Sequence, residues 1–420
     1  MKRSSQKALA AVCYASAMAR LDPFAAIRYE TARVDPNAVI APPYDVVSPA
    51  ERAVLAKRSP YNAIHIDLPV PDESRGLDAY ENATRTFSAW IDSGVVRRDP
   101  NRAFYVYRLS FHDERGRRQE MTGLLCALGL DLEARGEVLP HEQTMPKDRQ
   151  DRLSLLHSTR LNTSPIWGLS LAQGLTVACR AALSQAGPPD WRAVDDAGVA
   201  HELWVITEES EIAEIAEIGA SAQILIADGH HRYQTACSYA TECRERNGNR
   251  PGPYDFVLAF VVELSEDELS IRAFHRLVKG VPADRIAQVL QRWFRIEAAP
   301  EDLVALPATS SPGVIGLLTS EGYKLLYPLT ALEQASGDDL DSSRLMVVLN
   351  DLGAHELSYE PGWYEATVAV RSGRADAAFL LRPVPVARIE AVAETGRLMA
   401  PKSTYFHPKP RTGMAFRSLE

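Results

Sequence analysis

Apolar residues along the chain follow two spacings, one typical of helices and one typical of strands. Residues 77–91 repeat apolar side chains at steps of three and four, and Gly94 follows as a stop signal, so this segment predicts an amphipathic helix. Residues 105–111 alternate apolar and polar positions, and a second apolar run follows the turn at 113–116, which predicts a β-hairpin. The two patterns mix without a repeat and predict an α+β fold with mixed sheets and helices.

The rest of the chain shows the same mixture of patterns. The predicted elements are two helices within 176–222 that flank a strand at 201–207, a buried strand at 254–264, a helix at 283–294, a hairpin at 313–329 with its turn at 320–322, a helix at 342–353 and a strand at 376–384. We expect a disordered extension at 1–17, an N-terminal α+β domain at 18–268 that holds the site, and a C-terminal α+β domain at 269–420. No Pro/Gly/Ser linker marks the boundary between the two domains.

Composition and charge narrow the classes of function. The 420 residues are 46% hydrophobic, and 46 Lys+Arg against 55 Asp+Glu give a net charge of −9. This charge disfavours extended nucleic-acid binding but leaves a local basic pocket open. The five cysteines are scattered without a C-x-x-C pair, which fits the cytoplasm, and no apolar run approaches the roughly 18–20 residues that cross a bilayer, so we expect no membrane partner.

The segment 224–246 combines a strand, a polar turn and a helix. Apolar residues 224–227 predict a short buried strand, Asp228–Gly229 predicts a turn, and helical spacing follows. Unpaired backbone N–H groups and the positive end of the helix dipole would lie beside the first helical turn, so the segment predicts an anion site. Two alternatives are Asp228 as a plain N-cap and metal ligation by the two histidines, although adjacent histidines point apart on a helix. The first turn carries His230, His231 and Arg232.

A charged segment at 139–152 is the second candidate for chemistry. It holds one histidine, three acids and three bases, and two prolines stiffen the backbone around Glu142. Lys147 and Arg152 would let such a loop close over phosphates. The alternative is a solvated loop that leads into a helix.

Two further segments are rich in turn residues. In 41–49, Tyr44 and Asp45 follow two prolines, and they belong either to a substrate site or to a rigid entry into a helix capped by Ser48, with Glu51 at the capping-box position. Near the C-terminus, 401–410 carries Lys402 and Tyr405 between prolines. This segment predicts either a substrate lid or phosphate clamp, or an ordered tail that packs on the core.

Several of these segments occur together in one family. The segments are "APPYDVVSPAE" (41–51), "NAIHIDLP" (62–69), "LPHEQTMPKDRQDRLSLLHSTRLNTSPIWGL" (139–169), "IADGHHRYQTA" (226–236), "FHRLV" (274–278) and "APKSTYFHPKP" (400–410). In this order they resemble the bacterial and archaeal domain-of-unknown-function family numbered 1015, from Met18 to nearly the C-terminus. The family name implies no activity.

The segment "ADGHHR" is also similar to the Gly-x-x-Arg phosphate-binding element of the ParB/sulfiredoxin superfamily, and especially to its free-serine kinases. Those kinases carry an Asp-Gly-His-x-Arg motif at a helix N-terminus and a catalytic glutamate in an upstream His-Glu segment, which would be His141-Glu142 here. This sequence departs from the pattern of those kinases in its spacing. Glu142 precedes Asp228 by 86 residues, which is a wider gap than a compact ParB-like module has.

The second resemblance implies a ParB/sulfiredoxin-like strand–DGHHR–helix element that binds ATP or ADP with Mg²⁺, and a small-molecule substrate as the other partner. We expect a nucleotide-dependent kinase that phosphorylates a hydroxyl such as that of free serine. The alternatives are a nucleotide- or phosphate-sensing protein without turnover and a phosphate- or metal-dependent hydrolase. The expected catalytic residues are Glu142 and Asp228; the expected phosphate ligands are Gly229, His230, His231, Arg232, Lys147 and Arg152; and the expected substrate contacts are Tyr44, Asp45, His141, Lys402 and Tyr405.

Overall fold

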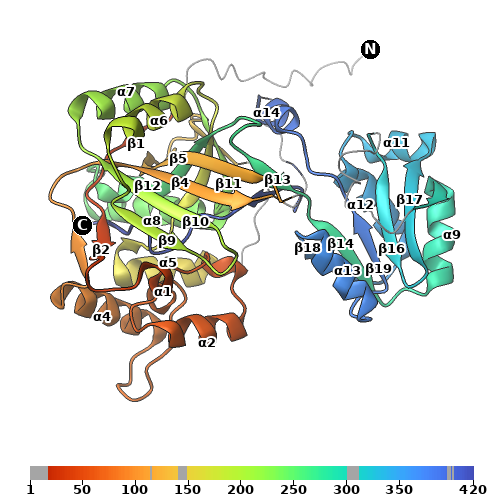
Figure 1. Cartoon of the computed structure of the whole chain (residues 1–420), viewed down its shortest axis with the longest axis horizontal. Coiled ribbons are helices and arrows are strands. Elements are labelled where there is room, and N and C mark those ends of the chain that lie inside the picture. Colours follow the sequence, from red (N-terminus) through yellow and green to blue (C-terminus); the bar gives the residue numbers. More distant parts are fainter. Residues whose placement is uncertain (1–17, 114–115, 141–148, 300–311, 395–398, 400–401) are drawn as a thin grey trace, which may run out of the picture.

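The structure is a computed structural model, and it describes residues 18–113, 116–140, 149–299, 312–394, 399 and 402–420. The expected extension at 1–17 lies outside these residues. Figure 1 shows a larger and a smaller part, each built from a sheet with helices against it. The predicted α+β class is therefore confirmed. Within the described residues, no helix is long and apolar enough to cross a membrane.

The strands of the larger part come mostly from the first two thirds of the chain. They are β1 (Leu21–Asp22), β2 (Ile27–Tyr29), β3 (Val96–Arg98), β4 (Phe104–His112), β5 (Arg118–Gly129), β6 (Val138–Pro140), β7 (Leu161–Asn162), β8 (Ile166–Ser170), β9 (Trp191–Val194), β10 (Ala200–Ile206), β11 (Ile224–Asp228), β12 (Phe256–Glu263), β13 (Ser270–Arg272), β20 (Tyr405–His407) and β21 (Arg417–Ser418). The helices of this part are α1 (Pro36–Val39), η1 (Tyr44–Val46), α2 (Pro49–Arg58), α3 (Ile64–Asp67), α4 (Ala79–Asp92), α5 (Arg149–Thr159), α6 (Leu175–Gln185), α7 (Glu209–Gly219), α8 (His230–Arg246) and η3 (Pro253–Asp255).

The main sheet of the larger part has the strand order β6-β11-β8-β12-β5-β4-β10-β9, and β1 pairs with β5. Strand β11 runs antiparallel to β8 and parallel to β6, and β8 runs parallel to β12. Since β6 and β11 are parallel and Pro140 lies opposite Ile226, both strands end at the same edge of the sheet. This edge is where Asp228 lies.

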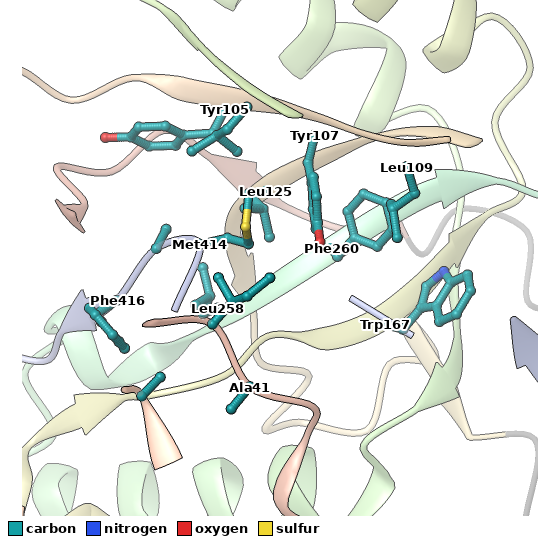
Figure 2. Packing of buried hydrophobic residues seen from close by; sticks show 14 of the residues in the cluster. Ala41, Tyr105, Tyr107, Leu109, Leu125, Trp167, Leu258, Phe260, Met414 and Phe416 are labelled. Carbon is teal, nitrogen blue, oxygen red and sulfur yellow. The ribbon is translucent and has the colours of Figure 1, made fainter. Parts of the chain in front are cut away.

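Side chains of the main sheet alternate between two apolar cores, as the period of two along a strand requires. In β4, Tyr105 and Tyr107 belong to the core on the side of α2, α3 and α4, whereas Phe104 and Val106 belong to the core on the side of α6, α7 and α8. Figure 2 shows the first of these cores, in which side chains of β4 and β12 pack against Ala41, Met414 and Phe416. Residues near both ends of the chain therefore close this core.

The smaller part holds a second sheet, with the strand order β15-β17-β16-β19-β14-β18. Its strands are β14 (His275–Lys279), β15 (Phe294–Ala298), β16 (Ile315–Thr319), β17 (Gly322–Pro328), β18 (Glu356–Glu360) and β19 (Ala377–Leu380). Its helices are α9 (Ala283–Trp293), α11 (Thr330–Ser336), α12 (Asp341–Leu352) and α13 (Trp363–Arg371), and α14 (Val386–Glu394) leads back toward the larger part. Helices α9 and α12 cover one face of the sheet, and α13 covers the other.

Residues 402–420, which we call the C-terminal tail, return to the larger part. Strand β20 pairs with β13 and β21 pairs with β7, and Figure 1 marks the C-terminus beside the larger part. The backbone N–H of Ile27 donates to Phe416. The expected domain division at 268/269 remains a proposal about folding units; these contacts join the last residues of the chain to the first sheet.

The predicted local elements are confirmed at their expected positions. The helix predicted at 77–91 is α4, which begins with a capping box at Asp78, and the hairpin predicted at 105–111 is formed by β4 and β5. The predicted capping box at Ser48 is also present, at the start of α2. Strand β9 was not predicted. Its side chains alternate between buried and exposed over only four residues, and an alternation this short is hard to recognise in a sequence.

Candidate functional site

The site begins where β11 passes into α8 through Gly229. This residue is the N-cap of α8 and has a left-handed φ of 89°. A Cβ atom at this position would lie 3.0 Å from Cγ2 of Ile166 and 3.1 Å from Cζ of Arg232, so the turn requires glycine both for its φ and for the space. The N–H groups at the start of α8 have no partner within the helix and point toward this turn.

Asp228 does not cap the helix, so the N-cap alternative from the sequence is wrong. No side chain caps α8; the carboxylate of Asp228 instead accepts from Nη2 of Arg232 at 2.9 Å and from Nζ of Lys409. The two charge pairs outcompete a cap because each is a charge-assisted bond. Burial raises the pKa of Asp228, but the charges of Lys409 and Arg232 outweigh burial and hold the pKa below its usual range. Such a carboxylate is a weak base, which favours a positioning role over the expected catalytic role.

Arg232 fixes the other side of the turn. Its Nη1 donates to the carbonyl of Pro165 and, at 3.4 Å, to Oγ of Ser164 in the segment that leads into β8. The side chain is 10% exposed. Burial alone would lower the pKa of Arg232, but the carboxylates of Asp45 and Asp228 raise it. The guanidinium therefore stays charged and rigid beside the N-terminus of α8.

Lys409 was not among the site residues predicted from the sequence. It reaches Asp228 from the C-terminal tail, and its side chain is 12% exposed. Burial alone would lower the pKa of Lys409, whereas the carboxylates of Asp228 and Asp45 raise it. Its Nζ lies 5.7 Å from the ring centroid of Tyr405, so this expected substrate contact does lie at the site.

Arg152 and Tyr44 are brought together beside Arg232. Nη1 of Arg152 donates to the carbonyl of Asp67 at 2.6 Å, and its guanidinium carbon lies 4.0 Å from the ring centroid of Tyr44. Burial raises the pKa of Tyr44 to about 12, so its hydroxyl keeps its proton. Asp45 is the next residue of η1 and is exposed. The expected residues of 41–49 thus belong to the same cluster as α8.

Asp67 is a second residue that sequence reasoning missed. Its carboxylate is buried and accepts from the hydroxyls of Thr163 at 2.6 Å, Ser164 at 3.4 Å and Thr412 at 3.2 Å. These partners come from a loop before β8 and from the C-terminal tail. The side chains are separated by about 100 to 350 positions along the chain, and no local pattern in the sequence signals such contacts.

The remaining predicted residues divide into two groups. His141, Glu142 and Lys147 lie outside the described residues, and Pro140 is the last described residue before them. The others are described: His230 is buried in the first turn of α8, and His231 is half buried there. The Nζ of Lys402 lies 5.0 Å from the ring centroid of Phe274. Within the described part of the chain, no three His, Cys, Asp or Glu side chains are arranged to hold a metal ion.

Comparisons with known proteins give one family match and several solved structures of low similarity. No curated protein matches the chain. Among solved structures, a conserved hypothetical protein from Pyrococcus furiosus matches at 12% identity and a TM-score of 0.35, over 67% of this chain and 90% of that one. A free serine kinase in complex with AMP matches at 14% identity and 0.35, over 67% and 86%, and a C-terminally truncated SbnI from Staphylococcus aureus matches at 12% and 0.38, over 68% and 84%.

The family comparison covers more than half of the chain. The matched residues are 21–343, which include the strand–turn–helix at Gly229 and the segments that hold Tyr44 and Arg152. The resemblance noted in the sequence is thereby confirmed. The chain belongs to the family described as protein of unknown function (DUF1015).

Proposed function

We propose that the first turn of α8 binds the phosphates of a nucleotide, ATP or ADP, and that the protein transfers a phosphoryl group to a hydroxyl of a small molecule. One observation carries this proposal: two largely buried cations, Arg232 and Lys409, meet beside the N–H groups that follow left-handed Gly229. A helix N-terminus with adjacent cations favours an anion, and phosphoryl transfer depends mainly on positioning and on neutralising phosphate charge.

Asp228 holds these two cations in place before the ligand arrives. Since its carboxylate already binds Arg232 and Lys409, neither long side chain has to be ordered when phosphate binds. Mg²⁺, when bound with the nucleotide, would neutralise part of the phosphate charge. The exposed carboxylate of Asp45 has the oxygen chemistry that this ion prefers.

A hydroxyl acceptor also needs a base, and we propose Glu142 for this role. Glu142 follows Pro140 by two positions, and β6 ends at the same sheet edge as Asp228. Of the carboxylates near α8, Asp67 accepts three hydroxyl bonds and Asp228 is paired with two cations, so both are poor bases. His141 and Lys147 remain proposed ligands of substrate and phosphate. We propose the cytoplasm as the compartment, since Cys126 and Cys179 are buried free thiols.

Glu142→Gln tests the proposal, because it keeps the shape of the side chain and removes the base. We expect turnover to fall by about 10²–10⁴ with nucleotide affinity nearly unchanged. Phosphorus NMR with ATP or ADP, Mg²⁺ and hydroxy compounds such as serine measures turnover, and calorimetry measures affinity. Glu133→Gln is a matched control, since Glu133 is an exposed residue paired with Arg135.

The outcomes separate the candidate functions. Unchanged turnover in Glu142→Gln would place the base elsewhere, with Asp45 next to be tested, and loss of nucleotide binding would make Glu142 a structural residue. A protein that binds nucleotide but transfers no phosphoryl group would be a nucleotide-sensing protein. This second candidate is supported by the pairing of Asp228 with Arg232 and Lys409, because a carboxylate held by two cations can position them for binding but is a poor base for catalysis.

A further inference from the structure

A cavity lies between the larger and the smaller part, where the chain crosses from one to the other. Its volume is about 370 Å³, which is within the roughly 300–1,000 Å³ that is typical of small-molecule sites. Strands β4, β5 and β13 line it from one side, and β14, β19 and the start of α13 line it from the other. Figure 1 shows β13 at this junction. None of the described lining residues belongs to β11, α8 or the C-terminal tail, so the cavity is separate from the α8 turn.

His275 presents a fixed hydrogen-bond donor to this cavity. The residue is 8% exposed, and its Nδ1 accepts from the backbone N–H of Leu381 at 3.2 Å. Burial and the charge of Arg276 lower the pKa of His275 to about 4, so near neutral pH the ring is uncharged and its one proton lies on Nε2. This Nε2 has no hydrogen-bond partner among the described residues. Because an unpaired buried donor costs free energy, the cavity favours a ligand that supplies an acceptor.

The carboxylates of the cavity are only partly balanced by cations. Three of the five belong to ion pairs, namely Asp113 with Arg117, Glu120 with Arg118 and Glu268 with Arg180. The other two, Glu266 and Asp267, are exposed at the rim and form no ion pair within the described part of the chain. Two unpaired carboxylates at the rim favour a ligand that carries a positive charge there.

Arg272 also lines the cavity, but its charge acts on the neighbouring strand. Burial and the charge of Arg272 lower the pKa of His407 in β20, so this guanidinium lies close to that histidine. Arg272 and Arg117 are the cations among the described lining residues, against five carboxylates. The balance of charge in the lining is therefore negative.

Apolar side chains supply much of the remaining wall. Trp363 at the start of α13 is half buried and contributes an aromatic ring, and Leu269, Ile271 and Leu381 contribute aliphatic surface. Burial of apolar ligand surface against such a wall is favourable, and a positive charge near an indole ring is attracted by the ring quadrupole. The wall therefore suits a small apolar body that is attached to the charged group.

We propose that this cavity binds a small organic amine, with its protonated amino group near Glu266 and Asp267, its apolar body against Trp363 and an uncharged oxygen acceptor on Nε2 of His275. A carboxylate in place of the uncharged acceptor is disfavoured, because it would face a lining of negative charge and a neutral donor. The ligand class is thus amines with an uncharged acceptor, such as amino-acid amides. This inference does not rest on the proposed phosphoryl transfer.

Four matched compounds test the three features of the ligand. Leucinamide has all three, leucine replaces the amide by a carboxylate, 4-methylpentanamide lacks the amino group, and 3-methylbutylamine lacks the acceptor. Ligand-observed NMR titrations of the full chain at about pH 6.5, where the amino groups are protonated, compare their affinities. We expect leucinamide to bind about fivefold or more tightly than each of the other three compounds.

A double variant at the rim tests the charged end of the ligand. Glu266→Gln with Asp267→Asn removes both unpaired carboxylates, and we expect leucinamide to bind about fivefold more weakly while 4-methylpentanamide is unaffected. The matched control is Glu214→Gln with Glu217→Gln, which removes two exposed charges from α7 and should bind leucinamide as the wild type does.

A variant of the buried histidine tests the acceptor end. His275→Asn keeps an acceptor for the N–H of Leu381 and removes the Nε2 donor, so it should abolish the preference for leucinamide over 3-methylbutylamine. A thermal unfolding measurement shows that the variant is folded. The rim variant tests the site independently if His275→Asn does not fold.

The outcomes also separate this inference from the proposed function. No binding of leucinamide, or equal weakening by the rim variant and its α7 control, would overturn the site. Equal binding of leucinamide and leucine, or of leucinamide and 4-methylpentanamide, would overturn the ligand class. Selective binding of leucinamide that depends on Glu266 and Asp267, in a protein that binds no nucleotide, would support the cavity and contradict the proposed function.

Discussion

Two buried ion clusters attach the C-terminal tail to the first sheet, and their contributing tail residues are only two positions apart. Arg411 binds the carboxylate of Asp195, which also accepts from Nε2 of His201 at 3.2 Å. Lys409 binds the carboxylate of Asp228, which also accepts from Arg232. Each cluster thus consists of one carboxylate between two cationic or cation-forming side chains.

The two clusters differ in what they leave unsatisfied. The Asp195 cluster is closed, because Tyr107 donates to Nδ1 of His201 at 2.6 Å and none of its described side-chain atoms is buried without a partner. The side chain of Asp195 is 5% exposed, whereas that of Asp228 is 20% exposed and lies beside the N-terminus of α8 and the unpartnered Nε of Arg232. The same kind of ion cluster is therefore fully paired at Asp195, whereas at Asp228 it keeps an unpartnered donor beside the site of the proposed ligand.

The largest expected effect comes from breaking the anchor. Asp195→Ala leaves Arg411 and His201 buried without their carboxylate, and we expect the free energy of unfolding to fall by about 3–5 kcal/mol. Urea denaturation measures this loss. Asp196→Ala is the control, because Asp196 forms an exposed pair with Arg58 that contributes at most about 1 kcal/mol. A loss below about 1 kcal/mol for Asp195→Ala would contradict its role as an anchor.

The next largest effect is expected at the Asp228 cluster. Lys409→Met keeps the length of the side chain and removes the charge, so nucleotide affinity should fall by about tenfold or more, corresponding to about 1.5–3 kcal/mol. Calorimetry with ATP and ADP measures the change. Lys279→Met, which removes a similar Lys–Asp pair with Asp376 in the smaller part, should leave the affinity unchanged. Equal affinity in wild type and Lys409→Met would remove Lys409 from the site.

The smallest effect is a pH dependence that belongs to the anchor. Burial lowers the pKa of His201 despite the opposing influence of Asp195, so His201 is neutral in the folded protein. The unfolded chain therefore binds the extra proton below about pH 6.5, and stability falls as pH decreases from there, by at most about 1.4 kcal/mol per pH unit. The lowered pKa of Asp195 has its effect only below about pH 4.

His201→Gln isolates this contribution from that of the other histidines. Urea denaturation at pH 7.0, 6.0 and 5.0 should show a smaller decrease in unfolding free energy for His201→Gln than for wild type. Because both proteins keep the remaining histidines, the difference in slope reports His201 alone. Identical slopes would mean that His201 titrates normally in the folded state.

Local patterns predicted the parts of the fold that depend on local spacing. Helix α4 and the β4–β5 hairpin follow directly from periods of 3.6 and 2, and the turn at Gly229 follows from a glycine between a strand and a helix. The resemblance carried by the longer segments identified the family. The sequence therefore predicted that Arg232 lies at the start of a helix, but it did not predict which residues Arg232 contacts.

Contacts between distant positions could not be predicted in the same way. Lys409 and Asp228 are 181 positions apart, and the partners of Asp67 lie in three separate segments. Such pairs depend on how the tail crosses the sheet, which the hydrophobic pattern does not encode. Asp228 was open to interpretation as an N-cap for the same reason, since nothing near it in the sequence reveals the two cations that occupy its carboxylate.

The return of the C-terminal tail sets an order for assembly during translation. Residues 402–420 leave the ribosome after every strand of the smaller part, yet Phe416 closes the first core and Lys409 completes the α8 cluster. The larger part must therefore wait for contacts of very high sequence separation, which slow folding and prolong the exposure of apolar surface. A nascent chain that has already built the second sheet still lacks Lys409 beside Asp228, so the proposed ligand site is completed only after the smaller part has been synthesised.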